Sequence, residues 1–218
     1  MDKELSDLLK EGVGRIDKKL LDTSTVDVLE KLYDEITLFN PAYKLVACDG
    51  RELVIRHILD CLAPVNIIKA ESENLKGFAD LGSGSGLPGV VLAAALTDKN
   101  FSLVERMGRR AGFLRSIVGL TGLGTRTDVV ESDLSELKTS FDAITFRAFR
   151  HMEDIASDLK RITKKGSRIF AYKSSEDDIA KELEDLNRLC SGLFESKTVS
   201  YEVPFLDAER NMLIITRK

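Results

Sequence analysis

The chain has 218 residues, of which 43% are hydrophobic and 31% are charged, and its formal net charge at pH 7 is −4. These values are typical of a soluble protein with one α/β domain and an extension, or with two small domains. They argue against a membrane protein, because no stretch approaches the roughly 20 consecutive apolar residues that span a bilayer. They also exclude global attraction to nucleic acid, so an RNA-binding surface would have to be local.

Neither the N-terminal sequence nor the cysteines and histidines suggest export or a bound metal. The first residues, MDKELSDLLKEG, are charged and amphipathic rather than a secretory signal, which predicts a cytoplasmic location. Cys48, Cys61 and Cys190 are far apart and form no CxxC pair. They predict neither a disulfide framework nor a thiolate site, and the two isolated histidines of the chain predict no metal site either.

Two helices are predicted in the first third of the chain. Between Val26 and Phe39 the apolar residues recur every three or four positions, the period of a helix with one buried face. A second helix is predicted at residues 51–62, and Pro64 discourages its continuation. Together they predict an N-terminal helical segment over residues 1–70.

From residue 71 onward, short apolar runs alternate with helical stretches, which predicts βαβ units and a mostly parallel sheet in a domain over residues 71–218. Five strands are expected, with the sequences GFADL, FSLVE, TDVVE, FDAITF and SRIFAYK. Helices are expected at 88–96, 108–120, 152–162 and 177–189, with a short turn at 134–137. Two late segments, ESKTVSYEV and NMLIITRK, would add an antiparallel pair at the edge and complete a seven-stranded sheet.

A glycine-rich turn joins the first of these strands to its helix. Asp80 ends the strand and is followed by Gly82, Gly84, Gly86 and Gly89. Glycine permits positive φ and close approach of the backbone to a ligand, while the helix N-terminus offers free N–H groups. The order of strand, turn and helix predicts a nucleotide-binding site.

Two cofactor classes fit this turn. Gly84, Gly86 and Gly89 satisfy the G-x-G-x-x-G pattern of nicotinamide-dependent oxidoreductases. Asp80 favours S-adenosylmethionine, because a carboxylate suits a ligand that carries an ammonium and a sulfonium. Glu105 ends the next strand about 20 residues on, where a carboxylate can accept hydrogen bonds from both ribose hydroxyls. The residues favour a methyltransferase, with an oxidoreductase or a purely structural turn as alternatives.

Six motifs, in the same order, resemble one protein family over nearly the whole chain. They are FNPAYKL with LVIRHILDCL, DLGSGSGLPGVVLA, RRAGFLR, FRAF, AYKS and VPFLDAERNMLII. The chain resembles the bacterial small-subunit ribosomal RNA guanine-N7 methyltransferases, also called glucose-inhibited division protein B. The resemblance implies an α/β, Rossmann-like class I methyltransferase fold with S-adenosylmethionine as cofactor. It also implies 16S ribosomal RNA, or an assembling small-subunit particle, as the partner.

The resemblance assigns most of the cofactor site position by position. The methionine and ribose portion would be held by Asp80 and by Gly82, Ser83, Gly84, Gly86 and Leu87. Glu105 would hold the ribose. Leu134 and Ser135 fall where the family contacts adenine, and Ser135 stands where an acidic residue is usual.

Arg147 and Lys173 are the expected catalytic and substrate-binding residues, because they match an arginine and a lysine of the family. Both lie at the carboxyl ends of predicted strands, the edge where ligands bind in open α/β sheets. Arg147 would touch the cofactor carboxylate or guanine O6, or else pair with Asp80 or Asp142. Lys173 would meet a phosphate, or else be a solvated lysine.

Two further residues are expected on the substrate side. The resemblance suggests His57, whose alternative is a helix-face residue bonded to a neighbouring backbone carbonyl. Arg109 belongs to a group of basic residues that predicts a local RNA-facing patch, or else a solvated face. Guanine N7 keeps an in-plane lone pair, so the reaction needs orientation and a polar environment rather than a general base. A methyltransferase for another RNA or a small molecule, and a non-catalytic RNA-binding module, remain alternatives.

Overall fold

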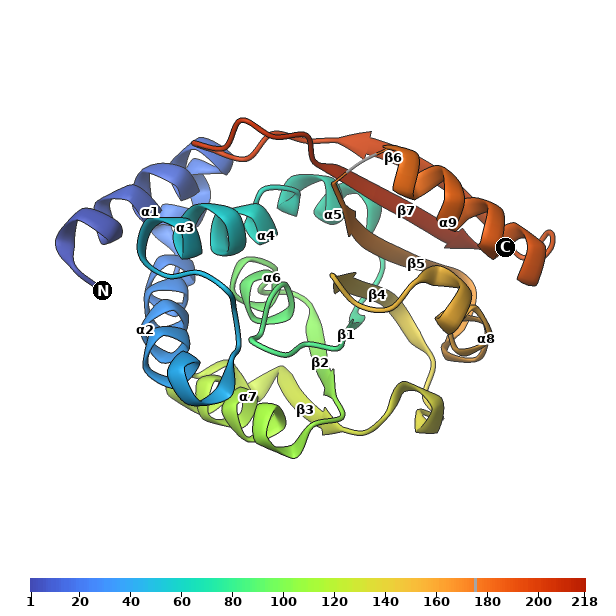
Figure 1. Ribbon diagram of the computed structural model, residues 1–218, viewed down its shortest axis with the longest axis horizontal. Coiled ribbons are helices and arrows are strands. Elements are labelled where there is room, and N and C mark those ends of the chain that lie inside the picture. The colour runs from blue at the N-terminus through green and yellow to red at the C-terminus, as the bar shows by residue number, and fades with distance from the viewer. Residues whose placement is uncertain (175) are drawn as a thin grey trace.

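A computed structural model describes residues 1–174 and 176–218, with the backbone alone for residues 176–178. Figure 1 shows one central sheet with helices on both faces. The N-terminal helices lie on the same face as α6 (Gly89–Ala95) and α7 (Gly108–Thr121), and the opposite face carries α8 (Met152–Ile162) and α9 (Glu176–Leu189). No helix in the described ranges is long and apolar enough to cross a membrane.

The sheet has seven strands in the order β3-β2-β1-β4-β5-β7-β6. Its strands are β1 Gly77–Leu81, β2 Asn100–Glu105, β3 Thr127–Glu131, β4 Phe141–Arg147, β5 Thr163–Lys173, β6 Phe194–Ser200 and β7 Asn211–Arg217. β1 to β5 pair in parallel, while β7 is antiparallel to both β5 and β6. The predicted seven-stranded, mostly parallel sheet with an antiparallel edge pair is therefore confirmed.

This strand order fixes where a ligand can bind. The chain runs outward from β1 to β3 in one direction and from β4 to β5 in the other, so the order reverses between β1 and β4. The helices that leave β1 and β4 lie on opposite faces and separate at their starts. A crevice is expected beyond the carboxyl ends of these strands.

The N-terminal segment is helical, as predicted, and contains more helices than the sequence indicated. Its main elements are α1 Lys3–Ile16, α2 Thr25–Tyr43, α3 Gly50–Leu53, η2 Val54–Leu59, α4 Asp60–Leu62 and α5 Val65–Glu71. The helix predicted at residues 51–62 forms, but its middle part, η2, is a π-helix. Such wide turns occur frequently at functional sites because they redirect side chains and backbone groups.

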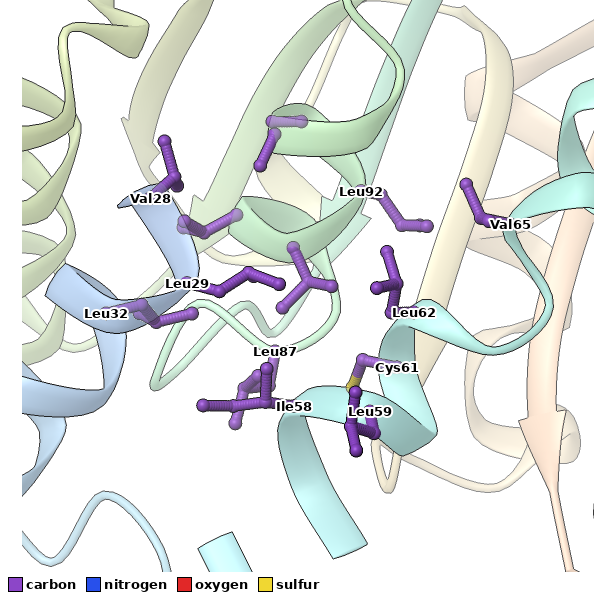
Figure 2. Close-up of a cluster of buried hydrophobic side chains, with 14 of the residues drawn as sticks. Val28, Leu29, Leu32, Ile58, Leu59, Cys61, Leu62, Val65, Leu87 and Leu92 are labelled. Atoms are coloured by element: carbon purple, nitrogen blue, oxygen red, sulfur yellow. The ribbon is translucent and has the colours of Figure 1, made fainter. Parts of the chain in front are cut away.

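The N-terminal helices and the sheet share one hydrophobic core. Figure 2 shows Leu29 and Leu32 of α2 beside Ile58 and Leu62, with Leu92 of α6 among them. All five side chains are buried in a single cluster that continues into β1 and β2. The division into residues 1–70 and 71–218 stays a prediction about folding units, since the core runs across it.

The connection between β6 and β7 ties the C-terminal edge back to these helices. It passes over the N-terminal helices in Figure 1, and the guanidinium of Arg15 lies 4.4 Å from the centre of the Phe205 ring. Arg51 of α3 approaches the same ring at 6.0 Å. Near the end of the connection, Arg210 Nε donates a hydrogen bond to Asp60 of α4, the residue that directly follows η2.

Candidate functional site

The glycine turn after β1 follows its predicted conformation. Gly82, Gly84 and Gly86 have φ angles of +67°, +55° and +82°, which glycine adopts without steric cost. A Cβ atom on Gly82 would lie 2.4 Å from the ring of Phe149, so no larger residue fits between that ring and the turn. A Cβ on Gly89 would lie 2.5 Å from Asp80 Oδ2, which shows how closely α6 packs on β1.

Asp80 lies beneath this turn and is completely buried. Its Oδ2 accepts hydrogen bonds from Ser83 Oγ at 2.6 Å and from the Gly89 N–H at 3.0 Å. Burial raises the pKa of the carboxyl from 3.8 to about 7, although these two hydrogen bonds act in the opposite direction. Asp80 thus fastens both ends of the turn, while its Oδ1 has no hydrogen-bond partner in the described part of the chain.

Glu105 stands at the carboxyl end of β2, directly beside the turn. Its Oε2 accepts a hydrogen bond from the Gly84 N–H at 3.0 Å, and its Oε1 accepts one from the Met107 N–H at 2.8 Å. Each oxygen keeps a further lone pair, because a carboxylate offers about four acceptor sites. Glu105 lines a cavity of about 250 Å³, the smaller cavity, together with Gly82 and Leu134.

Asp133 is an acidic residue of this cavity that was not predicted from the sequence. It follows β3 and accepts hydrogen bonds from the Ser135 N–H at 3.0 Å, from Ser135 Oγ at 2.8 Å and from Arg150 Nη2 at 3.0 Å. These contacts lower the pKa of Asp133 to about 2, so the group is ionised. Ser135 is exposed and does not border the smaller cavity; its part is to hold Asp133. The available signal was a carboxylate two residues after the end of the third strand, close to where Glu105 ends the second.

A larger cavity of about 500 Å³ lies on the other side of the FRAF segment. Ala148, Phe149 and Arg150 line both cavities, and we call them the shared wall. Ala148 has a φ of +48°, an uncommon conformation for a residue with a side chain. Among the side chains that the structure describes, six basic residues line the larger cavity against two acidic ones, Asp60 and Glu182; the basic ones are Arg56, Arg147, Arg150, Lys173, Lys181 and Arg210.

Arg147 lies at the end of β4 and is held by residues of η2 and by Asp60, which directly follows η2. Its Nη1 donates to Asp60 Oδ2 and to the backbone oxygen of Arg56, both at 3.1 Å, and its Nη2 donates to His57 Nδ1 at 2.5 Å. The predicted alternative pairing with Asp80 or Asp142 is wrong. Asp142 bonds to backbone N–H groups at the start of β1 instead.

Asp60 is a buried carboxylate that bridges two arginines. Besides Arg147 Nη1, its oxygens accept from Arg210 Nε at 3.1 Å. Burial raises the pKa of Asp60, although both arginines act to lower it. The bridge joins the N-terminal segment, β4 and the connection before β7 at one point.

His57 and Lys173 both border the larger cavity. The alternative of a bond from the His57 ring to a neighbouring backbone carbonyl is wrong, because the ring bonds to Arg147 and to no carbonyl among the described residues. Lys173 Nζ lies 2.5 Å from Glu182 Oε2, and the side chain of Lys173 is only 14% exposed. The alternative of a solvated lysine is therefore wrong as well.

The remaining candidates lie apart from the two cavities. Arg109 is exposed on α7, with its guanidinium 5.5 Å from the centre of the Tyr43 ring. Gly84, Gly86 and Leu87 border neither cavity; Leu87 packs in the core beside Ile58 (Figure 2). Within residues 1–174 and 176–218, no group of three or more His, Cys, Asp or Glu side chains is arranged to hold a metal ion.

Solved structures with the same fold define the class. The chain is similar to an O-methyltransferase from Bacillus cereus, with a TM-score of 0.59, 14% identity and coverage of 86% of this chain and 91% of that one. It is also similar to the precorrin-6y C5,15-methyltransferase from Geobacter metallireducens, with a TM-score of 0.52, 15% identity and coverage of 71% and 87%. The fold, with its crevice at β1 and β4, is that of the class I methyltransferases.

Sequence comparison narrows the class to a family. The profile of the family described as rRNA small subunit methyltransferase G matches residues 25–213. A relative named ribosomal RNA small subunit methyltransferase G from Borrelia turicatae is 33% identical over 196 residues, which cover 88% of this chain and 91% of the relative. A relative of the same name from Serratia proteamaculans is 33% identical over 181 residues, with coverage of 81% and 82%. The chain belongs to this family, which excludes the oxidoreductase alternative.

Proposed function

We propose that this protein transfers a methyl group from S-adenosylmethionine to N7 of a specific guanine in small-subunit (16S) ribosomal RNA. The family supports the reaction and the substrate class. One structural observation carries the proposal: a carboxylate-lined cavity beside a glycine turn meets a larger, arginine-lined cavity at the shared wall. The first suits a nucleoside cofactor, and the second suits a base attached to an anionic backbone.

The smaller cavity fits the nucleoside part of the cofactor. Glu105 has free lone pairs for the ribose hydroxyls, and the ionised Asp133 can accept from the amino group of adenine. Leu134 is buried and offers an apolar contact to the ring. The turn would hold the methionine portion; its residues, with Asp80 beneath them, are Gly82, Ser83, Gly84, Gly86 and Leu87. When bound, S-adenosylmethionine supplies an electrophilic methyl group.

The larger cavity would receive the guanine and its phosphates. Arg147 and Lys173 would act as the catalytic side chains by orienting the base and stabilising charge there, since N7 needs no base to remove a proton. His57 would contact the base, and the exposed Arg109 would contact RNA outside the cavities. The partner would be ribosomal RNA, free or in an assembling particle, which agrees with a cytoplasmic location.

Nucleoside mapping tests the proposal directly. Purified protein is incubated with labelled S-adenosylmethionine and either unmodified 16S ribosomal RNA or small-subunit particles, and the digested RNA is analysed by mass spectrometry. We expect one N7-methylguanosine per RNA, and no product with Gly84→Asp, which adds a second carboxylate near Glu105 at a position whose φ of +55° favours glycine. If the protein bound the cofactor with measurable heat but methylated neither form of RNA, a different methyl acceptor would replace this proposal.

A further inference from the structure

The tautomer of His57 is determined by its neighbour. Arg147 Nη2 lies 2.5 Å from His57 Nδ1. A guanidinium has N–H donors and no acceptor, so Nδ1 must accept and can carry no hydrogen. The proton of a neutral imidazole ring is then on Nε2, which is the only ring nitrogen left to meet a ligand in the larger cavity.

The surroundings keep this ring neutral and fixed. Burial, together with the charges of Arg147 and Arg56, lowers the pKa of His57 to about 4. Arg147 cannot easily turn away, because Asp60 and the Arg56 carbonyl hold its Nη1, and Arg210 holds Asp60 in turn. No hydrogen bond joins His57 Nε2 to another described residue, and the ring borders the larger cavity. His57 therefore presents a single, oriented N–H donor at neutral pH.

We infer that the Nε2–H group of His57 donates a hydrogen bond to O6 of the target guanine and selects guanine over adenine. The inference rests on the proposed function, which places the base in this cavity. Beside N7, guanine carries an O6 acceptor, whereas adenine carries an N6 amino donor. A fixed donor can hydrogen-bond to O6 of guanine but faces a second donor at N6 of adenine, which leaves both groups unpaired and disfavours binding.

The test pairs two changes, one on each side of the contact. The substrate is an RNA fragment containing the mapped guanine or, at that position, 2-aminopurine, which keeps N7 and lacks O6. The enzyme variant is His57→Asn, because its side-chain oxygen can still accept from Arg147 while nothing replaces the Nε2 donor. For the wild type we expect kcat/KM to fall about 10-fold or more on removal of O6, the size of one hydrogen bond to a buried group. For His57→Asn we expect a similar loss with guanine and no further loss with 2-aminopurine.

A rescue variant and a binding measurement complete the design. His57→Gln places an amide N–H near the position of Nε2, so part of the guanine preference should return. Calorimetric affinity for S-adenosylmethionine should stay within about threefold of the wild type in both variants, because His57 does not line the smaller cavity.

Several results would overturn the inference. The wild type could use 2-aminopurine as well as guanine, His57→Asn could keep the full O6 preference, or both variants could lose cofactor affinity. The second result would assign the donor to the remaining N–H groups of Arg147. Failure of the wild type to form N7-methylguanosine in either 16S ribosomal RNA or small-subunit particles would refute the proposed function itself, which is a distinguishable result.

Discussion

The two cavities on either side of the shared wall are built in different ways. The smaller one draws mainly on strand ends and the residues just after them, at 81–82, 104–107 and 132–134, and its key contacts are carboxylates that hold backbone N–H groups. The larger one needs side chains from segments as distant as 56–60 and 201–210, held by a buried ion pair. A local supersecondary unit thus provides one site, and tertiary packing provides the other.

The strongest test of this difference is Asp60→Ala. The change leaves Arg147 and Arg210 without their buried carboxylate, and breaking such a pair costs about 3–5 kcal/mol of the free energy of unfolding. Denaturant unfolding measures the loss, and S-adenosylmethionine affinity at low temperature should change little, because the smaller cavity does not contain Asp60. Glu195→Ala, at an exposed position on β6, is the control and should be neutral. If Asp60→Ala were equally neutral, the tertiary account of the larger cavity would be wrong.

Gly82→Ala makes the opposite test, on the local site. Its Cβ would meet the Phe149 ring at 2.4 Å, so the ring must move, and Phe149 lines the smaller cavity. Overpacking of this kind costs about 1–3 kcal/mol, which predicts a 10- to 100-fold loss of cofactor affinity by calorimetry. Gly122→Ala is the matched control, since Gly122 has a similar φ of +71° but open space around it. Equal effects of both substitutions on cofactor binding would contradict the role assigned to Phe149.

Asp133→Asn tests whether the residue missed in the sequence belongs to the cofactor site. The ionised carboxylate becomes a neutral amide, and a hydrogen bond to a charged acceptor contributes about 1.5–3 kcal/mol, so cofactor affinity should fall about 10-fold. Asp128→Asn, at an exposed position of β3, is the control and should leave the affinity unchanged. A normal affinity in Asp133→Asn would show that Asp133 serves only to hold Ser135 and Arg150.

The same contrast explains how much could be predicted from the sequence. The strand at 77–81, the strand at 127–131 and the helix at 152–162 match the structure to the residue, because their period and their flanking turns are local signals. Glu105 and the glycine turn were likewise found from spacing alone.

The parts that could not be predicted depend on contacts between distant residues. Asp60 and Arg210 are 150 positions apart, and no periodicity links them. The π-helical turn at 54–59, in which the Arg56 carbonyl accepts from Arg147, has no sequence signature of its own. Arg147 itself was found from the family motif, but its partner was not, because the choice among Asp60, Asp80 and Asp142 is made by packing.

The smallest expected effect concerns Asp80 and its pKa. The pKa of the Asp80 carboxyl is about 7 in the folded state, against an ordinary value of 3.8. Between pH 3.8 and pH 7 the folded state therefore holds a proton on Asp80 that the unfolded chain has lost. Stability should therefore fall as pH rises through this window. Asp80→Asn removes the titration, so the unfolding free energy of the variant minus that of the wild type should rise by about 1.4 kcal/mol between pH 6 and pH 8.

The difference in unfolding free energy between Asp80→Asn and the wild type isolates the titration of Asp80 from that of the other groups. The pKa of His57 is lowered from 6.5 to about 4 in the folded state, so below pH 6.5 the unfolded chain binds a proton that the folded state does not. This lowers the stability as the pH falls, but equally in the wild type and in Asp80→Asn. Any constant cost of placing an amide beside Ser83 and Gly89 also leaves the slope with pH unchanged. A difference that stayed flat from pH 5 to pH 8 would mean that Asp80 is ionised throughout. Its Oδ1, which has no hydrogen-bond partner among the described residues, would then carry a buried charge beneath the turn, and the smaller cavity would contain a buried carboxylate charge as the larger one does at Asp60.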